Sequence, residues 1–195
     1  MKLDIVGIVT AQHESEIETL CDFLERQKDR IQIILEIGTF QGGTAYIWSQ
    51  VAGQKVITVD LSFEREGWIP VYRGKETKVP IIEIQGNSSA METLEKVKAE
   101  LSGELVDLLF IDGDHGCEAC RADFFNYSPL VKDGGWIALH DIVHSPVGVP
   151  QAWNEIKKGH IFCEFIYQRQ DLNKQRTSRN PGEYMGIGLL QWGKK

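Results

Sequence analysis

Apolar and polar positions form alternating blocks along the chain, and these blocks predict strands and helices that follow one another. Residues 14–30 place Ile17, Leu20, Cys21 and Leu24 at the spacing of an amphipathic helix. The short apolar runs that follow, each bounded by polar or glycine-containing segments, are typical of buried strands. These predicted strands are residues 31–37, 55–60, 81–86, 106–112 and 134–141, with two more near 161–168 and 184–192.

Helices are predicted between most of these strands, at residues 43–52, 90–101, 117–131 and 149–159. Strands that alternate with helices indicate βαβ units and a parallel sheet with helices on both faces. The last two strands have no helix between them, which predicts an antiparallel pair. We therefore expect a Rossmann-like α/β fold with a mainly parallel seven-stranded sheet and an antiparallel closing strand. Residues 1–30 are expected to form a helical lead, and residues 31–195 a single domain.

The composition narrows the class of partner. The 195 residues are 42% hydrophobic and 25% charged, as in an ordinary globular protein, and the formal net charge is −7. Proteins that bind nucleic acid usually present a basic surface, so nucleic acid is not an expected partner. No apolar run approaches the roughly 20 residues that span a bilayer, and the N-terminus lacks a signal-peptide layout. We expect a cytoplasmic protein that acts on a small molecule, away from the membrane.

Three features carry weaker signals. Cys117 and Cys120 have CxxC spacing, but no second pair completes a zinc site. The two cysteines are therefore better interpreted as small residues of a helix. A long loop or broken helix after the second strand carries Trp68 and Tyr72, which could stack on an acceptor ring or pack against the sheet. The basic run at 169–179 is interpreted as a solvated loop, with a lid for an anionic acceptor as the alternative.

Polar and titratable residues gather where the predicted strands end. In an open α/β sheet the ligand crevice lies beyond the carboxyl ends of the strands. The residues at these ends are Glu36, Gly38, Asp60, Gly86, Asn87, Ser88, Asp112, Asp114, His115, His140 and Asp141. Solvation alone can explain some acids at strand ends, but it does not explain why so many of the strands end in this way.

The turn "LEIGTFQGG" at residues 35–43 tests which nucleotide the crevice suits. A dinucleotide site needs G-x-G-x-x-G, and Phe40 stands where its middle glycine would approach the pyrophosphate. The Walker pattern fails too, because Thr44 stands in place of its lysine. A nucleoside without a pyrophosphate remains. Asp60 suits a ribose diol and Glu36 suits an ammonium group, and S-adenosylmethionine offers both.

Four segments together carry a family resemblance: "ILEIGTFQGGTA", "VITVD", "IQGNSSAMETL" and "VDLLFIDGDHGCEACRADFFNYSPLVKDGGWIALHDI". They resemble the class I S-adenosylmethionine-dependent methyltransferases over residues 31–160. More narrowly, the chain is similar to the small-molecule O-methyltransferase branch, the methyltransferase-domain group related to cephalosporin hydroxylases and macrolide-sugar O-methyltransferases. The resemblance implies methyl transfer to a small molecule, at a hydroxyl oxygen. An NAD-dependent oxidoreductase and a non-catalytic nucleoside-binding protein are the alternatives.

The resemblance also implies a set of cofactor-binding residues. These are Glu36, Gly38, Thr39 and Gly42 on the methionine and ribose side, Asp60 at the ribose hydroxyls, Asn87 and Ser88 near the adenine, and Asp112, Gly113 and His115 under the reacting methyl group. Tight helix packing is the alternative role for Gly42 and Gly43, and a plain strand-end acid is the alternative for Asp60.

Transfer to a hydroxyl requires removal of its proton by a base or with the help of a divalent cation. The resemblance implies Asp112, His140 and Asp141 as ligands for Mg²⁺ or Mn²⁺, and the imidazole of His140 would favour a softer metal than magnesium. His115 or His140 is the candidate base, and Asp141 completes the expected catalytic set. A hydrogen-bonded strand-end histidine is the alternative for His140. The N-terminal helix could pair two subunits, and the acceptor cannot be read from the sequence.

Overall fold

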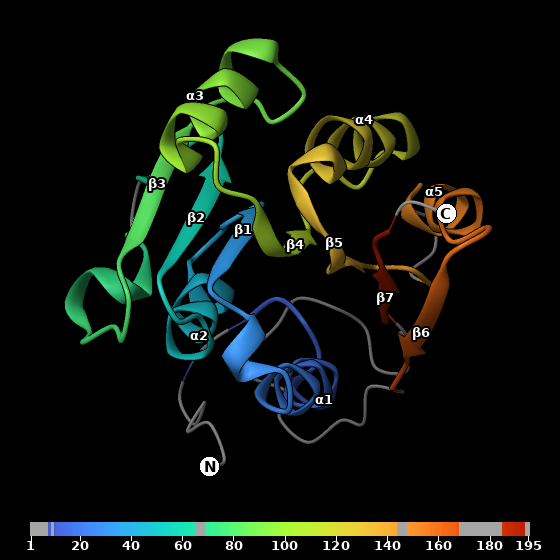
Figure 1. Ribbon diagram of the computed structural model, residues 1–195, viewed down its shortest axis with the longest axis horizontal. Helices are drawn as coiled ribbons and strands as arrows, with labels where there is room; N and C mark the ends of the chain where they lie inside the picture. The colour runs from blue at the N-terminus through green and yellow to red at the C-terminus, as the bar shows by residue number, and fades with distance from the viewer. Residues whose placement is uncertain (1–7, 9, 65–68, 144–147, 168–184, 194–195) are drawn as a thin grey trace.

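A seven-stranded sheet forms the centre of the molecule (Figure 1). The structure is a computed structural model that describes residues 8, 10–64, 69–143, 148–167 and 185–193. Its strands, in chain order, are β1 (Ile33–Ile37), β2 (Lys55–Asp60), β3 (Ile81–Gln85), β4 (Val106–Ile111), β5 (Val131–His140), β6 (Ile161–Phe165) and β7 (Ile187–Gln191). Their order across the sheet is β3-β2-β1-β4-β5-β7-β6.

The strand directions confirm the predicted topology. Strands β1 to β5 are paired in parallel, whereas β7 runs antiparallel to both of its neighbours, β5 and β6. A parallel return from β6 would need a crossover connection, usually a helix, and the sequence predicts none there. The fold is therefore the expected Rossmann-like α/β fold with an antiparallel closing strand.

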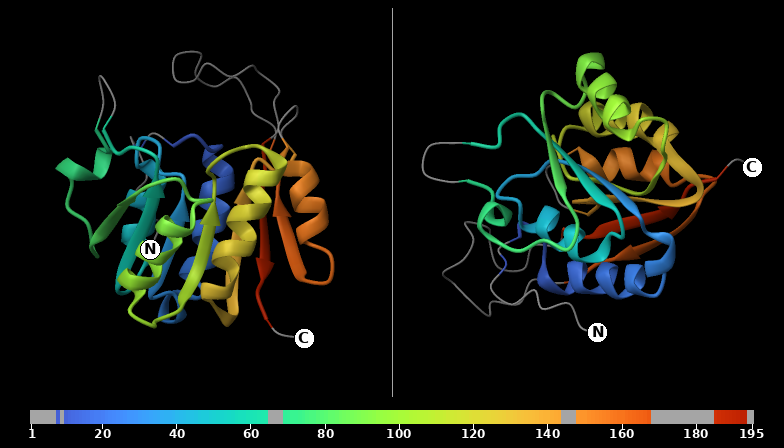
Figure 2. Two further views of the ribbon diagram at one scale, coloured as in Figure 1. Left: turned by 90° about the horizontal axis from the view of Figure 1, so that it is seen from above. Right: turned by 60° about the vertical axis from the view of Figure 1, so that its left-hand side comes forward.

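Helices cover both faces of this sheet. They are α1 (Glu14–Glu25), α2 (Gly43–Val51), α3 (Met91–Leu101), α4 (Cys117–Tyr127) and α5 (Val149–Ile156). Helices α1 and α2 lie on one face, and α3, α4 and α5 lie on the other (Figures 1 and 2). Each layer buries its apolar side against the strands, so the core has two halves, one on either side of the sheet.

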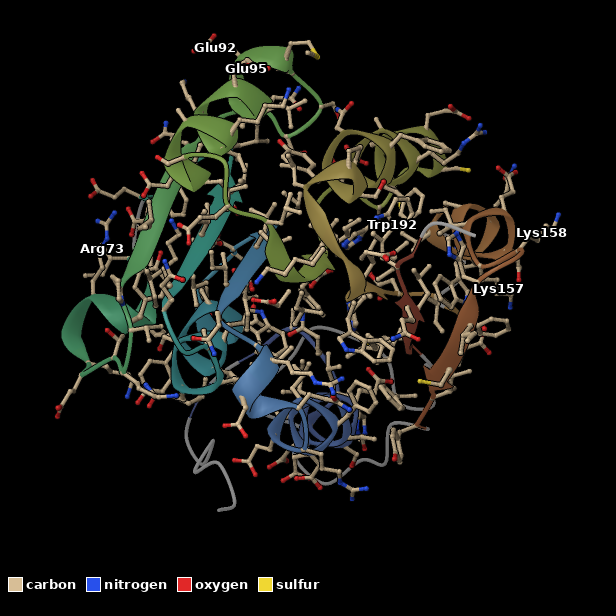
Figure 3. All side chains as sticks on the ribbon, viewed as in Figure 1. Arg73, Glu92, Glu95, Lys157, Lys158 and Trp192 are labelled. Atoms are coloured by element: carbon tan, nitrogen blue, oxygen red, sulfur yellow. The ribbon has the colours of Figure 1, made fainter. Side chains whose placement is uncertain are left out.

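The centre of the sheet is closed to solvent, and side chains fill the space between the sheet and its helices (Figure 3). Every residue of β1 and of β4 is buried, as near-continuous apolar runs covered on two faces predict. Helix α1 contributes Leu20 and Leu24 to the same core half as Ile34 of β1 and Phe110 of β4. The N-terminal helix therefore packs directly on the sheet that carries the strand ends.

Helices α1, α4 and α5 end three or more residues earlier than their patterns predict. Helix α1 ends at Glu25, and the 3₁₀ helix η1 (Lys28–Arg30) follows it. Helix α4 ends at Tyr127 and gives way to the 3₁₀ helix η3 (Ser128–Leu130). The second change has a direct cause, because Pro129 has no amide hydrogen to continue the helix.

The segment after β2 contains one short 3₁₀ helix, η2 (Val71–Gly74). Arg73 of η2 (labelled in Figure 3) holds this segment to β3. It donates hydrogen bonds to Glu83 of β3 and another to Glu64. Trp68 and the basic run at 169–179 lie outside the described residues. Within the described parts of the chain, no helix is both long and apolar enough to cross a membrane.

Candidate functional site

A cavity of about 640 Å³ opens at the carboxyl ends of the parallel strands. Parallel strands bring their carboxyl ends to one edge of the sheet, so residues distant in sequence meet there. The lining residues are Ala11, Ile37, Gly38, Phe40, Val59, Asp60, Leu61, Gly86, Asn87, Ser88, Ser89, Asp112, Gly113, Asp114, His115 and Ala119. The cavity thus gathers most of the strand-end residues that the sequence singled out.

The turn after β1 is closed around Asp60. Oδ2 of Asp60 accepts hydrogen bonds from the backbone N–H groups of Thr39 and Phe40, both at 2.9 Å. Gly38 has φ +92°, and a Cβ there would lie 2.0 Å from the carbonyl oxygen of Asp112. Only glycine fits this position, because the backbones of the β1 and β4 ends touch at it.

Phe40 extends from this turn into the cavity. Its side chain is half exposed and lines the cavity, and its backbone has φ +47°, a left-handed conformation that costs free energy for a bulky residue. Its amide already donates to the carboxylate of Asp60. A bridging diphosphate at this turn would meet the aromatic ring and would compete with a negative charge for the same N–H groups.

Glu36 lies behind the cavity wall. It is fully buried, and its carboxyl group accepts hydrogen bonds from Nε1 of Trp48 at 3.0 Å and from the hydroxyl of Thr58 at 2.6 Å. Burial raises the pKa of Glu36 to about 8, although these hydrogen bonds oppose the rise. The carboxyl group is therefore protonated at neutral pH, and it ties β1 to β2 and α2.

Thr39 and Gly42, two other residues predicted on the methionine side, also make their contacts with the protein interior. Thr39 is buried and shares a 2.5 Å hydrogen bond with the hydroxyl of Thr58. Gly42 has φ +77°, and a Cβ there would lie 2.5 Å from the ring of Tyr72. Tyr72 is itself buried and donates its hydroxyl hydrogen to Glu83, so it packs against the turn rather than into the cavity. Close packing, the alternative considered for Gly42, describes its contacts.

The loop after β3 forms the opposite wall of the cavity. Gly86, Asn87 and Ser88 all line the cavity, and the last two are the residues that the resemblance assigns to the adenine. Oδ1 of Asn87 accepts the N–H of Ser89 at 3.0 Å, which shapes the turn. The carbonyl of Ser88 accepts a 2.9 Å hydrogen bond from the hydroxyl of Tyr127 in α4.

Charged side chains meet where β4 and β5 end. Nδ1 of His140 lies 3.1 Å from Oδ1 of Asp112, and Nε2 of His115 lies 3.3 Å from Oδ2 of Asp141. His115 also approaches Oδ1 of Asp112, at 3.7 Å. Asp141 is fully buried with φ +61°, a left-handed backbone conformation that is uncommon outside functional sites and turns. The structure thus brings together the four residues proposed for catalysis or metal binding at this end of the sheet, Asp112, His115, His140 and Asp141.

The charges in this cluster stabilise one another. Burial alone would raise the pKa of Asp112, but the charge of His140 and hydrogen bonds from both histidines outweigh it and hold that pKa well below its usual range. Burial alone would lower the pKa of His140, but the charge of Asp112 and the hydrogen bond between Nδ1 and Asp112 outweigh it, and the nearby carboxylate of Glu16 adds to the rise, so the pKa reaches about 10. The contact with Asp112 likewise raises the pKa of His115. At neutral pH this is a buried imidazolium beside a carboxylate.

Two residues that precede β1 in the chain also belong to this cluster, and the sequence did not single them out. Nε2 of Gln12 donates a short hydrogen bond to Oδ2 of Asp112. Glu16 of α1 is fully buried, with Oε2 3.7 Å from Nε2 of His140 and Oε1 accepting the N–H of Gly186 at 3.0 Å. Nothing in the helical pattern separates Glu16 from the other acids of α1, so only the tertiary contacts reveal it.

The ligand atoms of Asp112, His115 and Asp141 lie within 4.8 Å of one another and could hold a metal ion. This set differs from the predicted one in a single residue. His140 is 2% exposed and its Nδ1 faces Asp112, so it supports the group from behind, and His115 lies on the open side. Two carboxylates and one imidazole are ligands that suit Mn²⁺ better than Mg²⁺.

The cysteines and a second hollow do not bring reactive side chains together. The four cysteines are free, and burial raises the pKa of Cys120 to about 12, so its thiol is not ionised at neutral pH and is a poor nucleophile.

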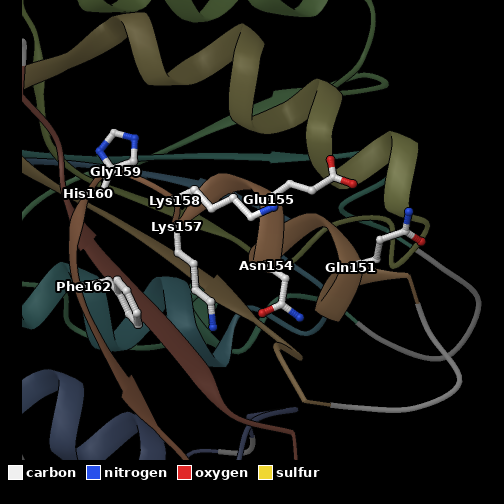
Figure 4. A pocket seen from close by; sticks show the side chains of 8 residues that line it. All are labelled: Gln151, Asn154, Glu155, Lys157, Lys158, Gly159, His160 and Phe162. Atoms are coloured by element: carbon white, nitrogen blue, oxygen red, sulfur yellow. The ribbon is translucent and has the colours of Figure 1, made fainter.

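A second hollow of about 720 Å³ lies beside α5 and β6, where the labelled side chains spread apart rather than converge (Figure 4). Its Lys157 is held by Glu164 at 2.8 Å. Larger volume does not make this hollow the better site.

Comparisons with known proteins match the same segment of the chain. A family model described as "Methyltransferase domain" matches residues 35–142, more than half of the chain. An uncharacterized protein, y4gI, of Sinorhizobium fredii (strain NBRC 101917 / NGR234) is 27% identical over 106 residues, which cover 53% of this chain and 10% of that protein. The chain thus spans about a tenth of the curated relative that it matches.

Solved methyltransferase structures share the fold. The MycE methyltransferase from the mycinamycin biosynthetic pathway, in complex with Mg, SAH and mycinamycin VI, has a TM-score of 0.60 at 14% identity, over 90% of this chain and 49% of that one. An O-methyltransferase from Bacillus cereus in complex with SAH has a TM-score of 0.64 at 17% identity, over 96% and 86%. An rRNA methylase from Streptococcus thermophilus has a TM-score of 0.61 at 14% identity, over 95% and 100%.

Proposed function

The chain belongs to the family of methyltransferase domains, and on that premise we propose that it transfers a methyl group from S-adenosylmethionine to a hydroxyl oxygen of a small molecule. The observation that carries the proposal is the turn closed by Asp60 beside the cavity of about 640 Å³. It suits a nucleoside and disfavours a pyrophosphate. The net charge of −7 favours a small acceptor over a nucleic acid.

Asp60 is the residue that we assign to the ribose. Its carboxylate accepts hydrogen bonds from the backbone N–H groups of Thr39 and Phe40 at Oδ2 and of Ser62 at Oδ1, which hold the carboxylate in a fixed position. Asp60 also lines the cavity, so a ribose bound there would lie beside an oriented acceptor of hydroxyl hydrogens.

His115 is the residue best suited to take the acceptor proton. In the transfer, the acceptor oxygen bonds to the methyl carbon, the bond from that carbon to sulfur breaks, and the hydroxyl proton passes to the base. His115 lines the cavity with its side chain 38% exposed, and Asp141 at 3.3 Å orients its Nε2. His140 is unsuited to the task, because it is buried and its raised pKa, about 10, keeps it protonated at neutral pH.

A divalent metal ion fits the same group of residues. Asp112, His115 and Asp141 would hold it, and two buried or half-buried carboxylates compensate its charge. Such an ion lowers the pKa of an acceptor hydroxyl. His115 would then serve as a ligand together with Asp112 and Asp141 and would not be available as the base. Metal dependence thus decides the role of His115.

A thermal-shift panel tests the proposal. S-adenosylhomocysteine at 100 times its dissociation constant adds about 2.7 kcal/mol to the free energy of unfolding. We expect a clear rise in Tm with this ligand and none with NAD or ATP. Mn²⁺ should add a further rise if the metal binds. Stabilisation by NAD alone would indicate an oxidoreductase, and S-adenosylhomocysteine binding without turnover of any metabolite extract would indicate a non-catalytic binder.

A further inference from the structure

The two edge strands of the sheet, β3 and β6, differ in how they are protected. Glu83 of β3 accepts hydrogen bonds from the hydroxyl of Tyr72 at 2.9 Å and from the guanidinium group of Arg73, which tie η2 to that edge. Only one residue of β3 is exposed, whereas four of the five residues of β6 are. No described strand lies beyond β6 in the sheet (Figures 1 and 2). Proteins usually block an open strand edge, because it pairs readily with another strand.

The exposed side chains at the β6 edge are largely apolar. Ile161 is 75% exposed and Phe162 is 46% exposed, and Ile166 and Tyr167 are exposed directly after the strand. Among the described residues, ten large hydrophobic side chains are exposed, and four of them fall within residues 161–167. Exposed apolar residues are normal when they are scattered singly, but a group of them marks an interaction surface.

The backbone of β6 also offers hydrogen-bonding groups at this edge. In β7, the N–H of Trp192 donates to the carbonyl of Gly135 at 2.8 Å and its carbonyl accepts the N–H of Gly134 at 2.7 Å, so both groups point toward β5. This direction alternates along a strand, so Gln191 points its groups toward β6, where it pairs with Ile161. The odd-numbered residues of β6 therefore bond to β7, and the even-numbered residues turn their N–H and C=O groups outward.

We propose that β6 pairs in the antiparallel direction with β6 of a second copy of this chain, about a two-fold axis at Cys163. Cys163 is the middle residue of the strand, so this register pairs its full length. The outward N–H and C=O groups of Phe162 then bond to those of Glu164 in the second copy, and the reverse pair forms by symmetry. On the other face, Ile161 lies opposite Phe165 of the second copy, so exposed apolar side chains cover each other.

The charges beside the strand suit a second copy. Nζ of Lys157 lies 2.8 Å from Oε1 of Glu164 and 5.2 Å from the ring centroid of Phe162. Because Glu164 of the second copy would lie opposite Phe162, each Lys157 would lie near a carboxylate of either chain. Lys158 adds a positive charge to the hollow beside the strand (Figure 4). The edge is thus complementary to itself in length, in apolar surface and in charge.

This pairing is independent of the proposed function, because β5 and β7 separate β6 from the strands that end at the cavity. Sedimentation velocity of the full chain tests it. At micromolar concentration we expect a dimer of about 44 kDa, twice the 22.1 kDa of one chain. A monomeric parent overturns the inference, since another segment of the chain or a different protein would then cover the edge.

Ile161→Lys places a charge at the edge of each copy. It should raise the dissociation constant of the dimer about 30-fold or more, because the symmetry counts the change twice. Met91→Lys is the matched control, since it introduces the same charge at a side chain of α3 that is 62% exposed. It should leave the dissociation constant unchanged. A dimer that Ile161→Lys does not weaken overturns the inference, because another face, such as α1, would then join the two copies.

Cys163 reports the register in the parent itself, with no variant that has to fold. It is exposed and its thiol is free. In the proposed register the two Cys163 residues form a pair without mutual hydrogen bonds, whose Cα atoms lie about 4.5 Å apart, within the range that a disulfide spans. Oxidation by copper phenanthroline should link the dimer covalently. Cys163→Ser should abolish the link and Cys117→Ser should keep it, and a dimer that does not link through Cys163 overturns the inference.

Discussion

Glu36 and Asp112 are two buried carboxyl groups at the ends of neighbouring strands, and they avoid the cost of burial in opposite ways. Glu36 has only neutral donors around it, Trp48 and Thr58, and its raised pKa, about 8, keeps it uncharged. Asp112 has two histidines, and its lowered pKa keeps it charged. Strands β1 and β4 are direct neighbours in the sheet, but Glu36 is fully buried whereas Asp112 lines the cavity, so the neighbouring side chains and access to the cavity both distinguish the two groups.

This contrast divides the site into two functional halves. In the half around β1 and β2, backbone N–H groups hold the carboxylate of Asp60 in place, and the proposed function assigns the ribose to this preformed turn. The half around β4 and β5 holds charges in a low-dielectric setting, where they act strongly on a reacting group. We infer that binding depends on the first half and chemistry on the second, and variants can separate them.

The largest expected effect is in the charged half. His140→Gln removes the cation between Asp112 and Glu16 and should lower the free energy of unfolding by about 4 kcal/mol at pH 7, as for other broken buried pairs. The contribution of His140 to the free energy of unfolding also depends on pH. The folded pKa of His140, about 10, exceeds its unfolded value of about 6.5, so the contribution is complete below pH 6.5 and is lost as the pH rises through 10.

Urea unfolding of the parent and of His140→Gln at pH 6, 8 and 10 measures this difference, which should shrink at the highest pH. His160→Gln is the matched control, because His160 stacks on Trp192 at a half-buried position far from any carboxylate cluster of the site. It should change the free energy of unfolding by less than about 1 kcal/mol. A pH-independent gap for His140→Gln would mean that the histidine is neutral in the folded protein.

Gly38→Ala disrupts the close backbone contact between Gly38 and Asp112, which joins the two halves of the site. The added Cβ would lie 2.0 Å from the carbonyl oxygen of Asp112, and φ is +92°. We expect a loss of about 3 kcal/mol in the free energy of unfolding and no measurable binding of S-adenosylhomocysteine. Gly74→Ala is the control, since a Cβ there meets nothing within 4 Å. It should stay within about 0.5 kcal/mol of the parent. Denaturant curves and calorimetry distinguish the two.

A smaller effect, with its own pH signature, is expected for Glu36→Gln. The folded pKa of Glu36, about 8, lies above its unfolded value near 4.5, so its contribution to stability is complete below pH 4.5 and is lost as the pH rises through 8. Glutamine keeps the shape and cannot ionise. As the pH is raised from 6 to 8, the free energy of unfolding of the variant, measured in urea, should increase relative to that of the parent by about 2 kcal/mol. A constant difference would show that Glu36 is ionised at both pH values.

Much of this arrangement follows from local sequence patterns. The spacing of apolar residues and the short apolar runs predicted every described strand and α-helix, but not the 3₁₀ helices, because each of these longer elements depends mainly on its own residues and on burial against a neighbour. The residues predicted at the strand ends Asp60, Asn87, Asp112 and His115 all line the cavity, since parallel strands place their carboxyl ends together.

Other contacts could not be predicted, because they join distant parts of the chain. Gln12 reaches Asp112 across 100 residues, and Glu16 reaches Gly186 across 170. Glu36 shows a different limit. Its position beside the turn suggested contact with a ligand, but strand alternation points its side chain away from the cavity, toward Trp48. A motif specifies which residues are near a site and leaves open which way each one faces.

The smallest expected effect tests whether the ring of Phe40 or the charge of Asp60 would keep a diphosphate from this turn. Phe40 lines the cavity with φ +47°, so Phe40→Gly relieves backbone strain while it makes the unfolded chain more flexible. These opposing terms should leave the free energy of unfolding within about 1 kcal/mol of the parent. The amide at this position still donates to Asp60 in the variant, so NAD should still fail to raise Tm. NAD binding should appear only when Phe40→Gly is combined with Asp60→Asn, which removes the charge at the turn. If Phe40→Gly alone admits NAD, the ring and not the carboxylate keeps the diphosphate out, and the binding half owes its selectivity to shape rather than to charge.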